Sequence, residues 1–228
     1  IETYGINHFD VSMKAFEKVT QFTSCEFAVR PFIVQNPEKA FKILTEWSLH
    51  KNFHIRRLAS EGCRPKLPWA MALKDLQKDP TPILPILENL KNDDEDYVYR
   101  SVANNLNDIS KDHPELVLKI AKQWKGQTKN TNWLVKHSLR TLLKAGNQKA
   151  MTLFGYGKAK DVSISDFNLK NKKVSIGNYL AFSFKLQNKI KATNRLEYAI
   201  YFRRQNGELG KKVFKIFRGR HLAKRVGR

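Results

Sequence analysis

The stretch YVYRSVANN, Tyr97–Asn105, has two counterparts elsewhere in the chain, and this repetition decides the expected fold. HIRRLASEG at His54–Gly62 begins 43 residues before it, and WLVKHSLRT at Trp133–Thr141 begins 36 residues after it. Each segment has an apolar residue at its second position and a basic residue at its fourth. The apolar residues are Ile55, Val98 and Leu134. Self-similarity at such a period is typical of proteins that stack pairs of helices into a solenoid.

The segments around these repeats carry the spacing expected for helices. Apolar residues recur three and four positions apart in FKILTEW (41–47), ILPILENL (83–90), ELVLKIAKQW (115–124) and WLVKHSLRTLL (133–143). Turn signals containing Pro and Asp, DPTP from Asp79 and KDHP from Lys111, separate the units. We therefore expect a HEAT-like α-solenoid whose second helices line one concave face.

The basic residues of the repeat are Arg57, Arg100 and Lys136. On the second helices they would form a row along the concave face, spaced to follow a phosphate backbone. The alternative is that each basic residue solvates its helix or pairs with an acid in the preceding turn. Both interpretations remain open at this point.

The pattern changes near GYGKAKD, residues 155–161. The segments after it, DVSISDFNL (161–169), YLAFSFKL (179–186) and LEYAIYF (196–202), alternate with period two, which is typical of strands. Asn206-Gly207 is a hairpin signal. The sequence predicts a helical domain over residues 1–157 and a smaller all-β domain over residues 158–228.

Charge favours a polyanionic partner. The chain has 228 residues, and its 42 Lys and Arg against 21 Asp and Glu give a net charge of +21. The β region from Lys158 onward has 19 Lys or Arg against 4 Asp or Glu, a net charge of +15. Such an excess favours nucleic acid or an anionic membrane surface as partner.

Other classes of protein receive no support from the sequence. No stretch approaches 18 consecutive apolar residues, so we expect no membrane-spanning segment. Cys25 and Cys63 are the only cysteines and lack zinc-site spacing, so we expect neither a structural metal nor a disulfide scaffold. The chain begins at Ile1 without a secretory signal pattern.

Four segments resemble one known family. FTSCEFAVRPF (22–32), HIRRLASEGCRPKLPW (54–69), YVYRSVANNLNDISKDHP (97–114) and WLVKHSLRTLLKAG (133–146) are similar to the bacterial DNA alkylation repair family of HEAT-like-repeat glycosylases. The resemblance is greatest to its AlkC branch of 3-methyladenine DNA glycosylases. That branch carries an Ig-like β-sandwich after the solenoid, and the β segments here resemble its early strands. The resemblance implies a fragment that is truncated at both ends, with an incomplete β domain.

The resemblance also implies an activity. The family hydrolyses the bond between deoxyribose and a base alkylated at N3 in duplex DNA, as the first step of base excision repair, and is thought to act without base flipping. Because such a base is already cationic, its departure needs little protonation. The enzyme stabilises an oxocarbenium-like sugar and positions the attacking water, which carboxylates and electron-rich rings do through charge and cation–π attraction. We expect a cytoplasmic, nucleoid-associated monomer that binds alkylated double-stranded DNA and needs no cofactor and no membrane.

The same resemblance assigns candidate roles. The candidate catalytic carboxylates are, in order, Glu61, Asp108 and Asp96. Arg57 and Arg64 would grip phosphates beside the lesion, and Trp69 would wall the site or stack near it. The further candidate DNA contacts are Arg100, Asn104, Asn105, Trp133, Lys136 and Arg140.

Each candidate has a structural alternative. Glu61 would form a salt bridge with Arg57 one turn earlier, Asp108 would end its helix or bind a neighbouring loop, and Asp96 would be an N-cap. Asn104 and Asn105 would bridge repeats. The tryptophans at 69 and 133 would be core residues.

Further residues are expected to be structural. We interpret Trp47 and Trp124 as core and His137 as a packed histidine, since the reaction needs no general acid. Cys63 is expected to be inert, and Arg56 should point away from Arg57. The alternative function is a non-catalytic HEAT-repeat protein that binds damaged or branched DNA. A protein–protein scaffold would leave the charge of +21 unexplained.

Overall fold

The computed structural model describes residues 1–156, 162–188 and 194–219. The chain divides into two compact units, Ile1–Ala145 and Gly146–Arg228. The predicted domain boundary between residues 157 and 158 lies outside the described residues and stays a prediction.

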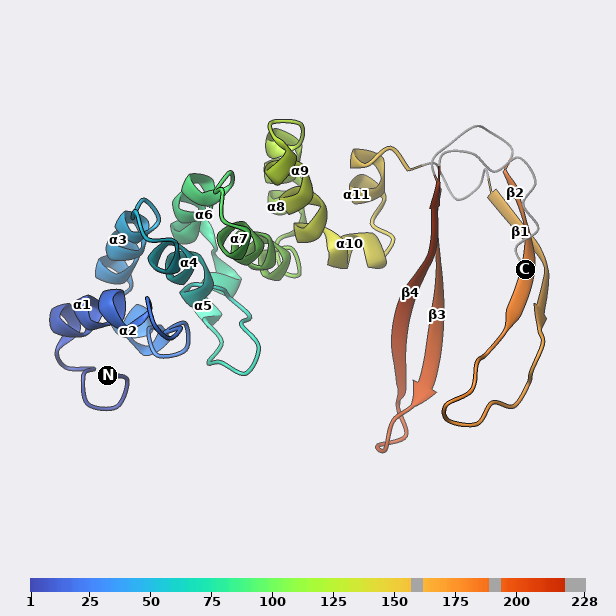
Figure 1. The fold of residues 1–228 in the computed structure, drawn as a ribbon, viewed down its shortest axis with the longest axis horizontal. Coiled ribbons are helices and arrows are strands. Elements are labelled where there is room, and N and C mark those ends of the chain that lie inside the picture. Colours follow the sequence, from blue (N-terminus) through green and yellow to red (C-terminus); the bar gives the residue numbers. More distant parts are fainter. Residues whose placement is uncertain (157–161, 189–193, 220–228) are drawn as a thin grey trace. The chain divides into compact units, whose positions relative to one another are not determined.

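The first unit is built from helix pairs stacked in sequence order (Figure 1). Its helices are α1 (Phe9–Val19), α2 (Arg30–Gln35), α3 (Pro37–Trp47), α4 (Phe53–Gly62), α5 (Lys74–Lys78), η1 (Thr81–Ile83), α6 (Leu84–Leu90), α7 (Asp96–Ile109), α8 (Pro114–Trp124), α9 (Lys129–Ser138) and α10 (Arg140–Lys144). Helices α4, α7 and α9 pack side by side as one layer, and α3, α6 and α8 pack against them as the other. The expected HEAT-like solenoid is confirmed.

Local sequence signals account for where these helices begin. Pro37 and Pro114 occupy the first position of α3 and α8, where the missing amide hydrogen costs no helical bond. The side chain of Asn52 accepts a hydrogen bond from the His54 amide at 2.9 Å and so caps α4. Thr128 and Thr131 form a reciprocal capping box at the start of α9.

The repeat position identified in the sequence forms the core of the layer. Ile55, Val98 and Leu134 are all completely buried. Trp47 and Trp124 are buried as well, which confirms their assignment to the core. The period of the repeat therefore follows from the need of each helix pair to bury its apolar face against the next pair.

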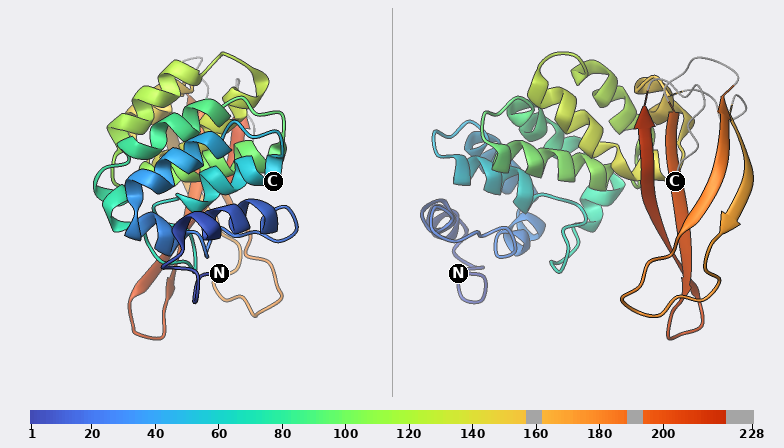
Figure 2. Two further views of the ribbon diagram at one scale, coloured as in Figure 1. Left: turned by 90° about the vertical axis from the view of Figure 1, so that its left-hand side faces the viewer. Right: turned by 45° about the vertical axis from the view of Figure 1, so that its right-hand side comes forward.

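Within its described residues, the second unit contains α11 (Gln148–Leu153) and four strands, β1 (Val162–Leu169), β2 (Phe182–Asn188), β3 (Asn194–Arg203) and β4 (Leu209–Gly219). β1 pairs with β2 and β3 with β4, both antiparallel (Figure 2). The predicted hairpin at Asn206-Gly207 is confirmed, and Gly207 has the positive φ of 82° that its turn requires.

An aromatic contact joins the two sheets. The rings of Phe182 on β2 and Tyr198 on β3 lie 5.5 Å apart in a T-shaped arrangement, and Tyr198 stacks on Phe214 of β4 at 5.2 Å. Two antiparallel sheets joined through apolar side chains form the start of a β-sandwich. The smaller all-β part expected from the sequence is confirmed.

Candidate catalytic and DNA-binding site

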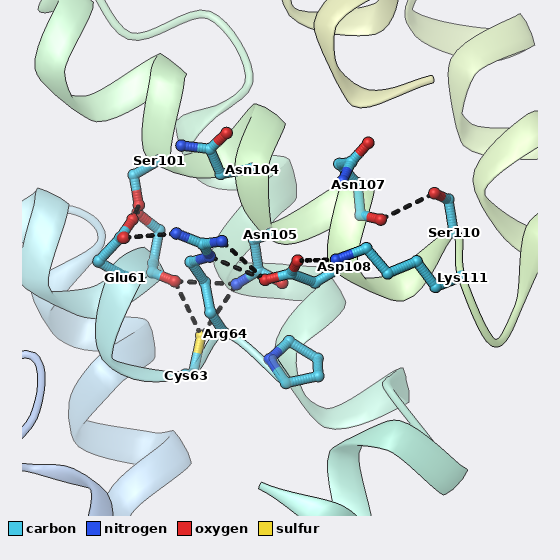
Figure 3. Close-up of polar contacts among 12 residues, drawn as sticks. Glu61, Cys63, Arg64, Ser101, Asn104, Asn105, Asn107, Asp108, Ser110 and Lys111 are labelled. Atoms are coloured by element: carbon cyan, nitrogen blue, oxygen red, sulfur yellow. Dashed lines mark hydrogen bonds and ion pairs between the residues drawn. The ribbon is translucent and has the colours of Figure 1, made fainter. Parts of the chain in front are cut away.

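A buried ionic cluster joins α4 and α7 (Figure 3). Arg64 Nη1 lies 2.7 Å from Glu61 Oε1, and Arg64 Nε and Nη2 each lie 2.9 Å from Asp108 Oδ2. All three side chains are buried. Ser101 Oγ donates a hydrogen bond of 2.6 Å to Glu61 Oε2. We call Glu61, Arg64, Ser101 and Asp108 the buried cluster.

Helix geometry explains why these residues meet. Ser101, Asn105 and Asp108 are spaced four and three residues apart on α7, so they share the face that packs against α4. Glu61 belongs to the last turn of α4, and Arg64 follows just after the C-cap residue Cys63. The end of one second helix therefore meets the middle and end of the next.

Charge within the cluster favours the cationic form of Arg64. Burial alone lowers the pKa of an arginine, but the nearby Glu61 and Asp108 carboxylates outweigh that effect and raise the pKa of Arg64. Lys111 adds a second cation, with its Nζ 2.9 Å from Asp108 Oδ1. Removing one member of such a buried pair leaves an uncompensated charge and costs about 3–5 kcal/mol.

Arg57 connects this cluster to the segment before α2. Its Nη1 lies 2.5 Å from Ser24 Oγ and 3.0 Å from Glu26 Oε2, and its Nη2 lies 3.5 Å from Glu61 Oε1. The salt bridge to Arg57 that was the structural alternative for Glu61 is therefore present. Among the described residues, Arg57 Nε and Glu26 Oε2 are buried without hydrogen-bond partners. Glu26 Oε2 nevertheless lies at ion-pair distance from Arg57 Nη1.

A small cavity of about 150 Å³ opens beside Arg57. Its lining consists of Thr20, Phe22, Thr23, Ser24, His54, Arg57 and Tyr97. The cavity is thus lined by residues that carry one guanidinium, one imidazole, four hydroxyls including the Tyr97 phenol, and the aromatic rings of Phe22 and Tyr97. Such a lining suits a phosphate or a sugar.

Glu26 is the acidic neighbour that the sequence analysis did not select. It lies in FTSCEFAVRPF, one of the segments that carry the family resemblance. Its proximity to Arg57 spans 31 positions along the chain and involves no shared helix. That segment was the only signal in the sequence that could have identified it.

The repeat also places cations over aromatic rings. His54, Tyr97 and Trp133 occupy the same position of successive repeats. The guanidinium of Arg57 lies 4.6 Å from the ring centre of Tyr97, and that of Arg100 lies 4.9 Å from the ring centre of Trp133. Arg57 and Arg100 thus each lie over the aromatic residue of the next repeat.

Two residues of the predicted basic row, Arg57 and Arg100, are paired with acids. Arg57 contacts two glutamates, and Arg100 forms an ion pair with Asp96 on the exposed side of α7. Lys136 on α9 is half-buried and has a contact of its own. Both interpretations of the row, phosphate binding and local pairing, therefore remain compatible with the structure.

Asp96 is separate from the buried cluster. It is the first residue of α7, twelve residues before Asp108, and the helical rise places the two about 18 Å apart. A hydrogen bond from Tyr99, together with one from Arg100, lowers the pKa of Asp96. The alternative of an N-cap is wrong, because the N-cap residue of α7 is Glu95.

Both asparagines bridge neighbouring helices. Asn105 Nδ2 donates to Ser60 O of α4 at 2.8 Å. Asn104 Oδ1 accepts from Arg140 Nη2 of α10 at 3.0 Å. The structural alternative for both residues is therefore present. The DNA contacts predicted for Asn104, Asn105 and Arg140 stay predictions.

His137 is a packed histidine, as expected. Its ring stacks on Trp133, with ring centres 4.7 Å apart, and Nε2 lies 3.2 Å from Asn104 Oδ1. Burial, with the nearby Arg140 and Arg100 cations, lowers the pKa of His137 to about 4. Trp133 is half-buried between these groups, so it is neither a full core residue nor a free surface ring.

Trp69 and Arg56 lie at opposite ends of the α4 region. Trp69 follows α4 in a loop, is 98% exposed and has a positive φ of 62°, so it is no core residue. Arg56 pairs with Asp93 at 2.6 Å and so points away from the partners of Arg57, as expected.

In the part of the chain that the structure describes, the cluster is accompanied by neither a metal-binding group nor a reactive thiol. Within the described residues, no three His, Cys, Asp or Glu side chains group in a way that could hold a metal ion. Burial raises the pKa of the Cys63 thiol to about 12, so it is not a nucleophile at neutral pH. In the same part of the chain, no helix combines the length and apolar character needed to cross a bilayer.

The fold defines a helical-repeat protein with a smaller β part, and comparison with known proteins gives its family. Residues 14–142 match the family described as DNA alkylation repair enzyme, and the chain belongs to that family. Residues 163–225 match the C-terminal Ig-like domain of the uncharacterised protein YhaZ.

Two relatives are similar along nearly the whole chain. The uncharacterized protein YhaZ of Bacillus subtilis (strain 168) is 49% identical over 216 residues, which cover 95% of this chain and 60% of that protein. The Pseudomonas fluorescens alkylpurine DNA glycosylase AlkC, solved bound to DNA containing an abasic site analog, superimposes with a TM-score of 0.88. It is 40% identical, and the match covers 96% of this chain and 61% of that one. The chain therefore spans about three fifths of the length of these relatives.

Proposed function

We propose that this chain forms the lesion-binding and catalytic part of an alkylpurine DNA glycosylase. The observation that carries the proposal is the buried cluster of Glu61, Arg64 and Asp108 between two second helices of a DNA alkylation repair family member. The net charge of +21 and the similarity to a glycosylase solved on DNA support a duplex substrate. The preferred bases would be cationic purines alkylated at N3, such as 3-methyladenine.

The reaction requires mainly that the protein hold charged groups in fixed positions near the sugar. A cationic base leaves as a neutral molecule, and the positive charge then develops on the sugar. Glu61 Oε2 accepts one hydrogen bond from Ser101, and a carboxylate oxygen has two lone pairs, so it can still face a sugar cation or its attacking water. Such preorganised electrostatic groups are typically worth about 10²–10³ in rate.

The three candidate carboxylates differ in support. Glu61 ranks first because Arg57 and Arg64 hold it from two sides. Asp108 ranks second, since Arg64 and Lys111 engage both of its oxygens. Asp96 ranks last because it is exposed, pairs with Arg100 and belongs to the other end of α7.

DNA would be held mainly through its backbone, with the damaged base still stacked. The proposed contacts to phosphate come from the basic row of Arg57, Arg100 and Lys136. The exposed Trp69 would wall the site or stack near it. Deformability of the damaged pair would then contribute to recognition. We propose a monomer that acts on the nucleoid in the cytoplasm.

Single-turnover release of 3-methyladenine from methylated duplex DNA tests this function. Glu61→Gln keeps the side-chain shape while removing its charge, so release should fall about 10²–10³-fold. Affinity for duplex containing an abasic-site analogue should stay level or rise slightly, because a negative charge near phosphates has been removed. Asp96→Asn is the matched control and should release the base at close to the wild-type rate.

The alternative function predicts different outcomes for the same release and binding assays. A non-catalytic protein that binds damaged or branched DNA needs the basic row but not Glu61. If the wild-type chain binds abasic-site duplex and releases no alkylated base, the glycosylase proposal is lost and the binding protein takes its place. If Glu61→Gln releases the base normally, the catalytic role passes to Asp108.

A further inference from the structure

Arg30 is a fully buried arginine outside the buried cluster. It begins α2, and no part of its surface is exposed. Its Nη1 donates to Gly62 O at 2.9 Å, its Nη2 to Arg64 O at 2.9 Å, and its Nε to Met71 O at 2.6 Å. One guanidinium thus joins three backbone carbonyls that lie 32 to 41 residues further along the chain.

These three carbonyls frame the residues proposed to act on DNA. Gly62 follows Glu61 at the end of α4, and Arg64 itself carries the side chain that bridges Glu61 and Asp108. Met71 lies two residues after Trp69. The loop is closed again by the Leu73 amide, which donates to Pro65 O at 3.2 Å. We call residues 63–73 the Trp69 loop.

Burying the charged side chain of Arg30 is energetically unfavourable, which indicates that the loop geometry it fixes matters. Burial is the main effect on Arg30 and lowers its pKa to about 10, so the side chain remains charged at neutral pH inside the protein. A buried cation is unfavourable unless hydrogen bonds satisfy it. Its planar fork can reach three divergent acceptors, which a lysine ammonium cannot do with the same geometry.

The Trp69 loop contains an uncommon backbone conformation that the three hydrogen bonds of Arg30 would hold in place. Trp69 has a φ of 62°, a left-handed conformation that non-glycine residues rarely adopt. Its side chain is 98% exposed, so packing of the ring does not stabilise that conformation. Backbone strain of this kind persists only where the surrounding structure determines it.

We propose that Arg30 is a positioning residue that fixes the Trp69 loop and the backbone of Arg64. It touches neither the DNA nor the reacting atoms. It sets where Arg64 meets Glu61 and where Trp69 meets the duplex. The proposal rests on the proposed glycosylase function for its effect on excision, but its effect on the loop can be measured independently.

Arg56 provides a matched control. Its Nε and Nη2 contact Asp93 at 2.6 and 2.9 Å, and its Nη1 donates to His50 O and Lys51 O, both at 3.0 Å. Arg56 therefore ties the start of α4 to neighbouring loops much as Arg30 ties its end. Substituting it removes a comparable set of hydrogen bonds without touching the Trp69 loop.

The test compares Arg30→Met, Arg30→Lys and Arg56→Met in the full 228-residue chain. Amide hydrogen exchange over residues 63–73 should accelerate in Arg30→Met and not in Arg56→Met. Single-turnover release should fall about 10–100-fold in Arg30→Met, because small misplacements of catalytic groups have effects of that size. Affinity for abasic-site duplex should change less than the rate does. All assays are run well below the lowest melting temperature in the set.

Arg30→Lys separates charge from geometry. It keeps the cation but loses the three-pronged fork, so it should recover more of the melting temperature than of the excision rate. If Arg30→Met does not fold, Arg30→Lys carries the test through the same exchange and rate measurements.

Two results would overturn the positioning role. One is normal exchange of the Trp69 loop in the folded Arg30 variant. The other is a loop that exchanges faster while release and binding both stay at wild-type levels. A wild-type chain that releases no base would instead remove the proposed function. In that case loop exchange and the affinity for abasic-site duplex decide whether Arg30 positions a DNA-binding loop.

Discussion

The two ends of α7 carry arginine–carboxylate pairs in opposite environments. At the first turn, Asp96 pairs with Arg100, and about half of each side chain is exposed, 54% in both cases. At the last turn, Asp108 pairs with Arg64, and the two side chains are 2% and 9% exposed. The same chemical pair is therefore a surface feature at one end and part of an interhelical core at the other. Burial, rather than residue type, separates the two candidate sites.

Neutralising one acid at each end of α7 tests most directly whether the buried pair contributes more to stability than the exposed pair. Asp108→Asn leaves Arg64 buried beside Glu61 alone, and we expect it to lower the free energy of unfolding by about 3–5 kcal/mol. Asp96→Asn removes an exposed pair of the kind that contributes little to stability, so its midpoint should hardly move. Urea unfolding of both variants measures the difference. Equal midpoints would show that the buried cluster contributes no more than the surface pair.

The repeat period and the apolar spacing were sufficient to predict this architecture. Helix pairs must bury an apolar face against the next pair, so Ile55, Val98 and Leu134 recur at one position and are all buried. Alternation and an Asn-Gly turn likewise predicted the strands, because those patterns follow from local backbone geometry. These features depend on neighbours that are near in sequence.

The site was less accessible to prediction for a physical reason. Glu61 and Asp108 are 47 positions apart, and Arg64 joins them only through the packing of α4 on α7. Glu26 meets Arg57 from a segment without regular helix, so no helical spacing marks the pair. Arg30 binds backbone carbonyls, which every residue has and which leave no pattern in the sequence. The family resemblance identified residue types that the periodicity alone did not distinguish.

A smaller effect on stability should come from His137. Its ring stacks on Trp133, which lies under Arg100 of the exposed pair. Its pKa is lowered in the folded protein to about 4, from an ordinary value of 6.5, so the unfolded chain binds more protons between these values. The stability contributed by neutral His137 is fully present above about pH 6.5 and falls as the pH drops toward 4. The free energy of unfolding, measured from pH 7 to 4, should therefore vary less with pH in His137→Phe, which keeps an aromatic ring but cannot titrate. An unchanged pH profile would contradict the lowered pKa.

Arg100 provides a test of whether the basic row binds phosphate. If Arg100 leaves Asp96 to contact a phosphate, Arg100→Ala should reduce the slope of log K against log salt by about 0.9, the value for one contact. Arg56→Ala, which removes an arginine held by Asp93 away from the row, should leave the slope unchanged. Binding to undamaged duplex over a range of salt concentrations measures both. An identical slope in Arg100→Ala would mean that local pairing with Asp96 is its whole role.

The smallest expected effect concerns the aromatic partner of Arg100. Trp133 lies under the guanidinium, with 4.9 Å between the guanidinium carbon and the ring centre, and stacks on His137 on its own helix. The ring carries no charge, so Trp133→Leu should leave the salt slope intact while weakening duplex binding a few-fold, because Arg100 loses the surface that orients it. Trp133→Phe retains a ring face and should bind more tightly than Trp133→Leu. The paired substitution Arg100→Ala with Trp133→Leu gives the decisive comparison, since a ring that acts only through Arg100 adds no further loss once Arg100 is gone. Additive losses in the double variant would instead indicate that Trp133 contacts DNA itself, which is the role predicted for it from the family resemblance.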